Sequence, residues 1–288
     1  MKSKLKKILP LAVVLTLFLG ISIAIYFNSH RLFVLFEELG VFCNQVSIVE
    51  NDGKLNTKEY TLSELEADER VTIDQSMMLV NTQYMLGESF VPDVSEYKDT
   101  DVFMSKCMLE AYASLSANIF EKFDKKLYVS SDFRTAEEQE QLYLDDPLTA
   151  TKVGASEHQT GLALDVYVAY YAGDGFIKSP VGRFVNTECW KYGFIIRYPS
   201  YGEDETGIRF EPWHIRYVGQ PHANIIYNNH LTLEEYILSL EIGQWYESCG
   251  YFICRQAMVD GELILPESFK SCTVSPDNTG YYIVTVKK

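Results

Sequence analysis

The sequence predicts an α+β fold: a small antiparallel sheet with flanking helices, preceded by an N-terminal transmembrane helix. Three observations predict it. Residues 8–27 form one uncharged, largely apolar run. Apolar side chains recur at helical spacing over residues 101–125, and the region that follows alternates short strand-like segments with helix-cap signals. The chain has 288 residues, of which 47% are hydrophobic, so it can bury a core of ordinary domain size.

The run at residues 8–27 is long enough to cross a bilayer. At ~1.5 Å per residue, a helix of this length spans the ~30 Å hydrocarbon core. Lysines precede the run and Glu37 and Glu38 follow it, so the positive-inside rule places the N-terminus in the cytoplasm and the rest outside. The alternative is a cleaved signal peptide, whose apolar region would normally span only ~7–15 residues. We expect an uncleaved, single-pass membrane anchor.

The net charge of −15 argues against nucleic acid as a partner, because phosphate binding requires basic patches. All six cysteines lie beyond the predicted anchor, where disulfides are permitted. Cys249, Cys254 and Cys272 cluster in the tail and are compatible with one bridge. Cys107 and Cys189 lie in helical patterns, which is typical of small buried hydrophobic residues.

Helix-cap and periodicity signals predict the main elements. Capping boxes at 135–138 and 232–235 each begin a helix, and Ser179-Pro180 supplies an N-cap with proline at the first helical position. Alternating apolar residues predict the strands. One helix is expected over 101–125, and three more are expected to begin at 136, 180 and 233. The expected strands cover 127–131, 162–168, 194–198, 208–211 and 213–218.

Two histidines and an aspartate form a candidate metal site. Asp165 lies in an otherwise apolar strand, and a buried carboxylate that lacks a partner destabilises a fold by several kcal/mol. His158 precedes it across a Thr-Gly turn, and His214 lies on a second strand. Two histidines and one carboxylate leave an open fourth position for water, the pattern of a catalytic rather than a structural zinc site.

Glu211 is the candidate proton carrier of this site. It precedes His214 by three residues, which places the two side chains on opposite faces of a regular strand. Pro212 can break the strand, so that both side chains reach one cavity and Glu211 can take a proton from water. In the alternative without a metal, Glu211 pairs with Arg216 or Arg209 and both histidines lie at the surface.

These residues also carry a family resemblance. The segments SEHQTGLALD (156–165) and EPWHIRY (211–217) resemble the signature of VanY-type D-alanyl-D-alanine carboxypeptidases, a zinc peptidase family that also includes LD-carboxypeptidases. The segment SDFR (131–134), followed by Gln139, resembles the family's Ser-Gly-Tyr-Arg…Gln segment. Asp132 and Phe133 depart from its Gly and Tyr, and an inward-pointing Asp132 would add negative charge beside a carboxylate-binding site.

The resemblance implies a role for each matching position. His158, Asp165 and His214 would bind one Zn²⁺, and Glu211 would be the catalytic base and acid. Arg134 would bind the terminal carboxylate of the substrate or the oxygen that becomes negative in the transition state. Further candidates for the substrate pocket are Gln139 and Ser156. We expect Trp213 to pack beneath the ligand strand, and Arg216 to pair with Glu211 or Asp165.

The uncharged run, the extent of the resemblance and the patterns on either side of it divide the chain. We expect a cytoplasmic tail at 1–7, a transmembrane anchor at 8–28, a stalk or linker at 29–75, a zinc carboxypeptidase domain at 76–243 and a C-terminal β appendage at 244–288.

The implied activity is removal of the C-terminal D-Ala from peptidoglycan stem peptides or their precursors on the outer face of the cell membrane, with a possible role in glycopeptide resistance. Two alternatives stay open: an LD-carboxypeptidase that trims tetrapeptides, and a non-catalytic cell-wall-binding module of the same fold. The intact Glu211 argues against the second alternative, because a binding module needs no base.

Overall fold

The computed structural model describes residues 28–51, 53 and 55–288, and it divides the chain into two compact units, Met1–Val41 and Phe42–Lys288. In the first unit, residues 28–38 are helical. The transmembrane helix expected at 8–28 falls almost wholly outside the described residues. Within the part of the chain that is described, no helix combines the length and apolarity needed to span a bilayer.

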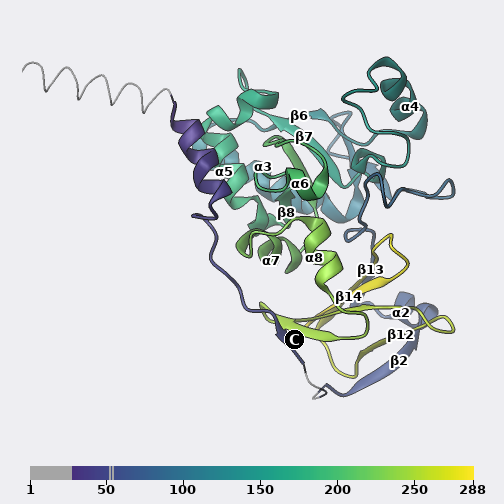
Figure 1. Cartoon of the computed structure of the whole chain (residues 1–288). Helices are drawn as coiled ribbons and strands as arrows, with labels where there is room; N and C mark the ends of the chain where they lie inside the picture. Colours follow the sequence, from purple (N-terminus) through teal and green to yellow (C-terminus); the bar gives the residue numbers. More distant parts are fainter. Residues whose placement is uncertain (1–27, 52, 54) are drawn as a thin grey trace, which may run out of the picture. The chain divides into compact units, whose positions relative to one another are not determined.

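The second unit contains a four-stranded antiparallel sheet, which confirms the small antiparallel sheet of the predicted fold class (Figure 1). We call it the site sheet. Its strands, in spatial order, are β6 (Tyr128–Ser131), β7 (Ala163–Tyr167), β9 (His214–Tyr217) and β8 (Phe194–Ile196).

The two faces of the site sheet differ in chemistry, because successive side chains of a strand alternate between them. Leu164 and Val166 of β7 and Ile215 of β9 point into an apolar core with the helices α3 (Leu109–Phe123) and α5 (Pro180–Glu188). Asp165 and His214 point to the opposite face. Burial of one face therefore fixes the register that places the polar side chains together on the other.

The helix-cap predictions are confirmed. Thr135 and Thr232 each form a complete capping box, at α4 (Ala136–Asp145) and α8 (Leu233–Ser239). The Ser179 side chain accepts from the Gly182 N–H at the start of α5. The predicted helix over 101–125 is only partly right, because its first turns are replaced by β5 (Phe103–Ser105), which pairs with β4 (Val94–Glu96), and by η1 (Lys106–Met108).

Three short helical elements lie in the chain segments that connect β7 to β8 and β8 to β9. They are η3 (Gly173–Lys178), η4 (Cys189–Tyr192) and α6 (Glu203–Thr206). A second core lies beyond β8 and contains α7 (His222–Asn228) and α8. Met77, Leu79 and Ile283 also belong to this core, so it joins the region of the site sheet to the C-terminal strands.

The C-terminal strands form a six-stranded sheet together with residues that precede the site sheet in the chain. Its strands, in order, are β1 (Val49–Glu50), β10 (Trp245–Ser248), β11 (Tyr251–Gln256), β14 (Tyr282–Lys287), β13 (Ser271–Pro276) and β3 (Val71–Ile73). Beside it, β12 (Glu262–Pro266) pairs with β2 (Thr57–Thr61), which leads into α2 (Leu62–Ala67).

This topology differs from the expected stalk at 29–75 followed by a separate tail appendage at 244–288. Strands β1, β2 and β3 each pair with a strand of the tail. Leu65 of α2 is buried in one apolar cluster with Leu263, Val274 and Val286. The early segment alone offers too few apolar residues to reveal this, because its partners follow about 200 residues later in the sequence.

The disulfide considered for the tail is absent. Cys249, Cys254 and Cys272 are free thiols. Cys254 lies on β11 and Cys272 on β13, and β14 is paired between these two strands. Strands of a sheet lie ~4.8 Å apart, so two strand spacings exceed the Cα separation that a disulfide can bridge.

Candidate metal centre

His158, Asp165 and His214 meet on the polar face of the site sheet. Asp165 lies in the middle of β7 and pairs directly with His214, the first residue of β9. His158 comes from η2 (Glu157–Thr160), which is followed by Gly161 in the left-handed conformation and then by β7. One ligand atom from each residue lies within 4.8 Å of the other two. The structure thus brings together the three residues predicted to bind a metal.

Contacts of the two imidazoles determine which nitrogen faces the aspartate. His158 Nδ1 lies 2.8 Å from the backbone oxygen of Asp132, which leaves its Nε2 3.6 Å from Asp165 Oδ1. His214 presents Nδ1 to Asp165 Oδ1 at 3.0 Å, while its Nε2 lies 3.6 Å from Glu157 Oε2. Metal-binding histidines commonly have the other ring nitrogen held by a carbonyl or carboxylate, as His158 Nδ1 is by the Asp132 carbonyl.

The donor set fits a divalent cation. Asp165 Oδ1 is buried and, among the described residues, accepts no hydrogen bond of acceptable geometry, although a histidine nitrogen lies near it. The His158 and His214 rings lie nearly perpendicular, with centroids 5.0 Å apart. Two imidazoles and one carboxylate are the ligands of a three-residue zinc site with an open position. A cation between them would satisfy the orphaned carboxylate oxygen.

The electrostatics of the metal-free site point the same way. Burial lowers the pKa of His214, but its contacts with Asp165 and Glu157 outweigh burial and raise that pKa to about 9. Burial raises the pKa of Asp165, but the two histidines hold it well below its usual range. Without a metal, the site therefore keeps a proton on His214 between two carboxylates. A divalent cation replaces this proton when it binds.

Glu211 lies beside the three candidate ligands. Its backbone N–H donates to Tyr198 O, and the His214 N–H donates back to Glu211 O at 3.0 Å, so the chain turns through Pro212 before β9 begins. This turn brings Glu211 Oε2 to 3.9 Å from His214 Nδ1. Burial raises the pKa of the Glu211 carboxyl, and the attraction of His214 only partly offsets it. A half-buried carboxylate with a raised pKa is suited to accept and return a proton.

One cavity of about 360 Å³ contains the whole predicted site. The residues predicted to act in the site all line it: Arg134, Gln139, Ser156, His158, Asp165, Glu211 and His214. Trp213, which we expected beneath the ligand strand, also lines the cavity and contacts the core behind the sheet.

Arg134 is held in a fixed position at the cavity wall. Its two terminal nitrogens donate to Gln139 Oε1 at 2.8 Å and to Ser131 Oγ at 2.7 Å. Gln139 is buried, and its Nε2 donates to Thr151 O at 2.6 Å, so its amide oxygen and its amide nitrogen both have protein partners. Gln139 therefore orients Arg134 in this structure. Asp132 does not point inward: its Oδ2 accepts from the Phe103 N–H.

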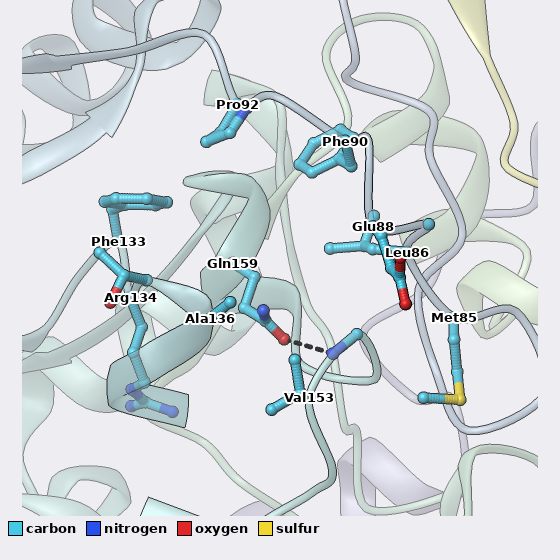
Figure 2. Close-up of a pocket in the computed structure, with 13 residues that line it drawn as sticks. Met85, Leu86, Glu88, Phe90, Pro92, Phe133, Arg134, Ala136, Val153 and Gln159 are labelled. Atoms are coloured by element: carbon cyan, nitrogen blue, oxygen red, sulfur yellow. Dashed lines mark hydrogen bonds between the residues drawn. The ribbon is translucent and has the colours of Figure 1, made fainter. Parts of the chain in front are cut away.

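A second cavity, of about 550 Å³, adjoins this one at Arg134 (Figure 2). Its walls are mostly apolar and include Phe90 and Phe133, and Gln159 Oε1 accepts from the Gly154 N–H at 2.7 Å on one side. The second cavity is larger, but it contains none of the metal-ligand candidates. The chemistry therefore belongs to the smaller cavity.

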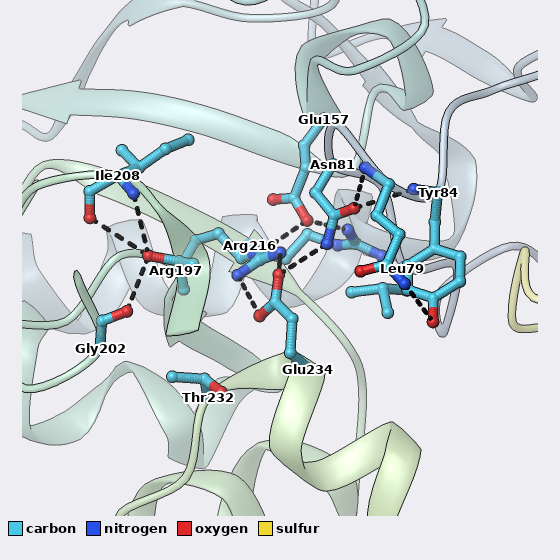
Figure 3. A network of polar contacts seen from close by, with 12 residues as sticks. Leu79, Asn81, Tyr84, Glu157, Arg197, Gly202, Ile208, Arg216, Thr232 and Glu234 are labelled. Carbon is cyan, nitrogen blue, oxygen red and sulfur yellow. Dashed lines mark hydrogen bonds and ion pairs between the residues drawn. The ribbon is translucent and has the colours of Figure 1, made fainter. Parts of the chain in front are cut away.

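Glu157 is a site residue that the sequence reasoning missed. Its side chain is fully buried, and its Oε1 accepts from Arg197 Nε at 2.7 Å and from Arg216 Nη1 at 2.6 Å (Figure 3). Arg197 also forms an ion pair with Glu234 of α8, at 2.8 Å from Nη1 to Oε2. Because Glu157 Oε2 faces His214, this buried network of Glu157, Arg197, Arg216 and Glu234 supports the metal centre from behind.

The expected pairing of Arg216 with Glu211 or Asp165 is wrong. Arg216 pairs with Glu157 and donates to the carbonyl oxygens of Ser76 and Met78 at 2.9 and 2.7 Å. The signal for this network was the presence of Arg197 and Arg216 within apolar strand segments, since a buried guanidinium requires acidic partners. The sequence does not identify the partners, because Glu157 and Glu234 are distant from both arginines along the chain.

The chain is similar to known proteins over most of its described length. A family model described as VanY, D-alanyl-D-alanine carboxypeptidase, matches residues 101–220. A D-alanyl-D-alanine carboxypeptidase of Enterococcus faecium is 29% identical over 265 residues, which are 83% of this chain and 82% of the relative. The bifunctional D-Ala-D-Ala dipeptidase and carboxypeptidase VanXYC of Enterococcus gallinarum is 32% identical, over 56% of this chain and 93% of the relative.

A solved structure supports the same relationship. The vancomycin resistance D,D-dipeptidase VanXYg, in complex with a D-Ala-D-Ala phosphinate analogue, superposes with a TM-score of 0.61 and 25% identity. The superposition covers 82% of this chain and 100% of that protein. The aligned region therefore includes most of the second unit. With the matching motifs gathered in one cavity, the chain belongs to the VanY family of D-alanyl-D-alanine carboxypeptidases.

Proposed function

We propose that the chain is a zinc-dependent D-alanyl-D-alanine carboxypeptidase, which removes the C-terminal D-Ala from peptidoglycan stem peptides or their precursors. The observation that carries the proposal is the convergence of two imidazoles, one orphaned carboxylate oxygen and a separate proton-accepting carboxylate in a single cavity. His158 Nε2, Asp165 Oδ1 and His214 Nδ1 would hold the zinc. Bound zinc would supply Lewis acidity to the scissile carbonyl and to water.

The chain's own residues would divide the rest of the reaction. Glu211 accepts the proton of the attacking water at its carboxylate and donates it to the nitrogen of the departing D-Ala. The Arg134 guanidinium faces the cavity as a fixed cation, and it binds either the terminal carboxylate of the substrate or the oxygen that becomes negative. Ser131 and Gln139 hold Arg134 in place, so little side-chain entropy is lost when substrate binds.

The proposal includes a location. The uncharged run at 8–27 with lysines before it supports a single-pass anchor that leaves the catalytic unit outside the cell membrane. A substrate displayed on the outer membrane face or in the wall would be within reach of such an enzyme. Removal of the terminal D-Ala also removes the end that glycopeptide antibiotics bind, so the activity would contribute to glycopeptide resistance.

Release of free D-Ala tests the proposal. The full chain, purified in detergent, is incubated with pentapeptide and tetrapeptide stems, with and without a chelator. The proposal expects D-Ala release from the pentapeptide, loss of this activity with the chelator and recovery on addition of zinc. Release from the tetrapeptide alone would instead identify an LD-carboxypeptidase. Binding of stems without release from either would identify a wall-binding module, and release that is unaffected by the chelator would contradict the zinc site.

A further inference from the structure

A pair of tyrosines lies next to the candidate metal centre on the same face of the site sheet. Tyr128 of β6 and Tyr167 of β7 are directly opposite each other in the register. Their rings stack with centroids 5.2 Å apart and an interplanar angle of 25°. Tyr167 follows Asp165 by two residues, so both side chains point to the polar face. Tyr167 is therefore about 7 Å along β7 from Asp165, a candidate metal ligand.

The pair is open to solvent. Tyr128 is 37% exposed, and it belongs to β6, which is an edge strand of the site sheet. Lys126 Nζ lies 5.0 Å from the centre of the Tyr128 ring. Tyr167 is partly buried. Exposed aromatic rings that are already ordered by stacking present a flat contact surface and lose little entropy on binding.

Asp165 lines the catalytic cavity, and the tyrosine pair continues the same face of the site sheet beyond it. The other lining residues are Arg134, Ser156, and residues of α4 and the loop after it, of η2 and of the segment 198–214. Among the described residues that line the cavity, none follows Asp165 on β7 or belongs to β6. A peptide held by its C-terminus beside Arg134 must leave the cavity toward its own N-terminus. The tyrosine pair lies beyond Asp165 on the same face of β6 and β7.

We infer that Tyr128 and Tyr167 form a subsite for the part of the peptide substrate on the N-terminal side of the scissile bond. This inference rests on the proposed function. An extended peptide advances ~3.3–3.5 Å per residue, so the pair is within reach of the second and third residues before the cleaved bond. The free dipeptide D-Ala-D-Ala is too short to reach it. The subsite therefore favours stem peptides over the dipeptide and makes the chain a carboxypeptidase rather than a dipeptidase.

A purely structural role for the pair makes a different prediction. Cross-strand aromatic pairs stabilise antiparallel sheets, so their loss would lower stability and weaken binding of every substrate alike. Dependence on substrate length separates the two roles. The informative variant is Tyr167→Thr, which removes the ring and retains a residue that favours strands.

The test measures binding separately from turnover. Full-length protein carrying Glu211→Gln, purified in detergent and loaded with zinc, is titrated calorimetrically with a pentapeptide stem and with D-Ala-D-Ala. Adding Tyr167→Thr should weaken pentapeptide binding about five- to tenfold, in line with the loss of one aromatic contact. Binding of D-Ala-D-Ala should stay unchanged. Tyr167→Phe, which keeps the ring, should retain most of the pentapeptide affinity.

A matched control is available on a different sheet. Tyr60 of β2 is partly buried and has Lys58 Nζ 4.9 Å from its ring centre, as Tyr128 has Lys126. Tyr60→Thr should leave both affinities unchanged, and melting temperatures of all variants report any loss of folding. The inference is overturned if the folded Tyr167→Thr variant binds the pentapeptide and D-Ala-D-Ala with equally reduced affinity, or if neither affinity changes. Failure of the proposed function has a different signature, which is that protein without substitutions releases no D-Ala from the pentapeptide.

Discussion

Two buried polar clusters share the polar face of the site sheet, and they differ in whether the protein itself satisfies them. In the buried network, Arg197 and Arg216 donate to Glu157, Glu234 and backbone oxygens. Around the metal cluster, Asp165 Oδ1, His214 Nε2 and Glu157 Oε2 have no hydrogen-bond partner among the described residues. Glu157 belongs to both, because its Oε1 accepts from two arginines while its Oε2 faces His214.

This difference separates a structural role from a functional one. Ion pairs and hydrogen bonds fix the positions of the arginines and of Glu157 Oε1 and Glu234, whereas an unsatisfied buried group requires something that the chain does not supply. The network holds η2, β8, β9 and α8 in place, and the candidate metal ligands lie at positions set by that frame. Four perturbations should affect these clusters differently.

The largest effect is expected for Glu211→Gln, which changes the chemistry and leaves both clusters intact. Loss of a general base typically reduces turnover about 10²- to 10⁴-fold. Zinc content, measured by atomic absorption, and the melting temperature should match those of the unsubstituted protein. If D-Ala release continued at a comparable rate, Glu211 would not be the base.

The second-largest effect is a loss of stability in Arg216→Met, which disrupts the buried network. It leaves Glu157 buried with a single arginine and leaves the carbonyl oxygens of Ser76 and Met78 without that donor. Removal of one partner from a buried ion pair lowers the free energy of unfolding by about 3–5 kcal/mol. Chemical denaturation measures the loss.

Arg209→Met is the matched control for that substitution. Arg209 forms an exposed ion pair with Asp174 at 2.7 Å. Exposed pairs contribute about 0–1 kcal/mol, so this variant should unfold almost like the unsubstituted protein. A similar loss of stability in both variants would show that the buried network does not have the structural role assigned to it.

Metal removal should reverse the pH dependence of stability through His214. In the metal-free protein its pKa is raised from the usual 6.5 to about 9, so the folded state binds a proton more tightly than the unfolded chain. This stabilisation is complete below pH 6.5 and is lost as pH rises through 9. Zinc at 100 times its Kd should add about 2.7 kcal/mol, and this contribution should fall at low pH as protons displace the metal.

Melting temperatures of chelated and zinc-loaded protein between pH 5 and pH 10 check this expectation. The chelated protein should lose stability above pH 6.5, while the zinc-loaded protein should not. Asp165→Asn, which removes a ligand, should abolish the stabilisation by zinc. Parallel curves for the two forms would contradict the assignment of His214 as a ligand.

The smallest effect is expected for Gln139→Ala, which removes a hydrogen bond that orients Arg134. Loss of one such bond corresponds to about 1 kcal/mol, so the KM for pentapeptide should rise roughly fivefold while kcat changes less. Gln141→Ala, on the exposed side of the same helix, where Gln141 donates to Asp145, should leave KM unchanged. Steady-state D-Ala release measures KM and kcat for both variants. If the KM of Gln139→Ala equalled that of the unsubstituted protein, Gln139 would have no role in positioning Arg134 for substrate.

The prediction of elements from sequence was best where the signal is local. The capping boxes at Thr135 and Thr232 involve residues only three positions apart, and both are present in the structure. The first turns of the helix expected over 101–125 were wrong because Phe103–Ser105 pairs with a strand outside that window. Tertiary pairing outweighed a helical pattern there.

The sequence by itself pointed to the three candidate metal ligands, to Glu211 as the candidate base and to Arg134, because these residues match the motifs of a known family, and the structure brings them into one cavity. The strand expected at 208–211 does not form, and β9 begins at His214. Only the tertiary structure decided which nitrogen of each imidazole faces Asp165, that Glu157 and not Glu211 pairs with Arg216, and that residues 49–73 complete the C-terminal sheet. These features depend on contacts between residues far apart in the chain, and burial and hydrogen bonding select such partners only once the chain is folded.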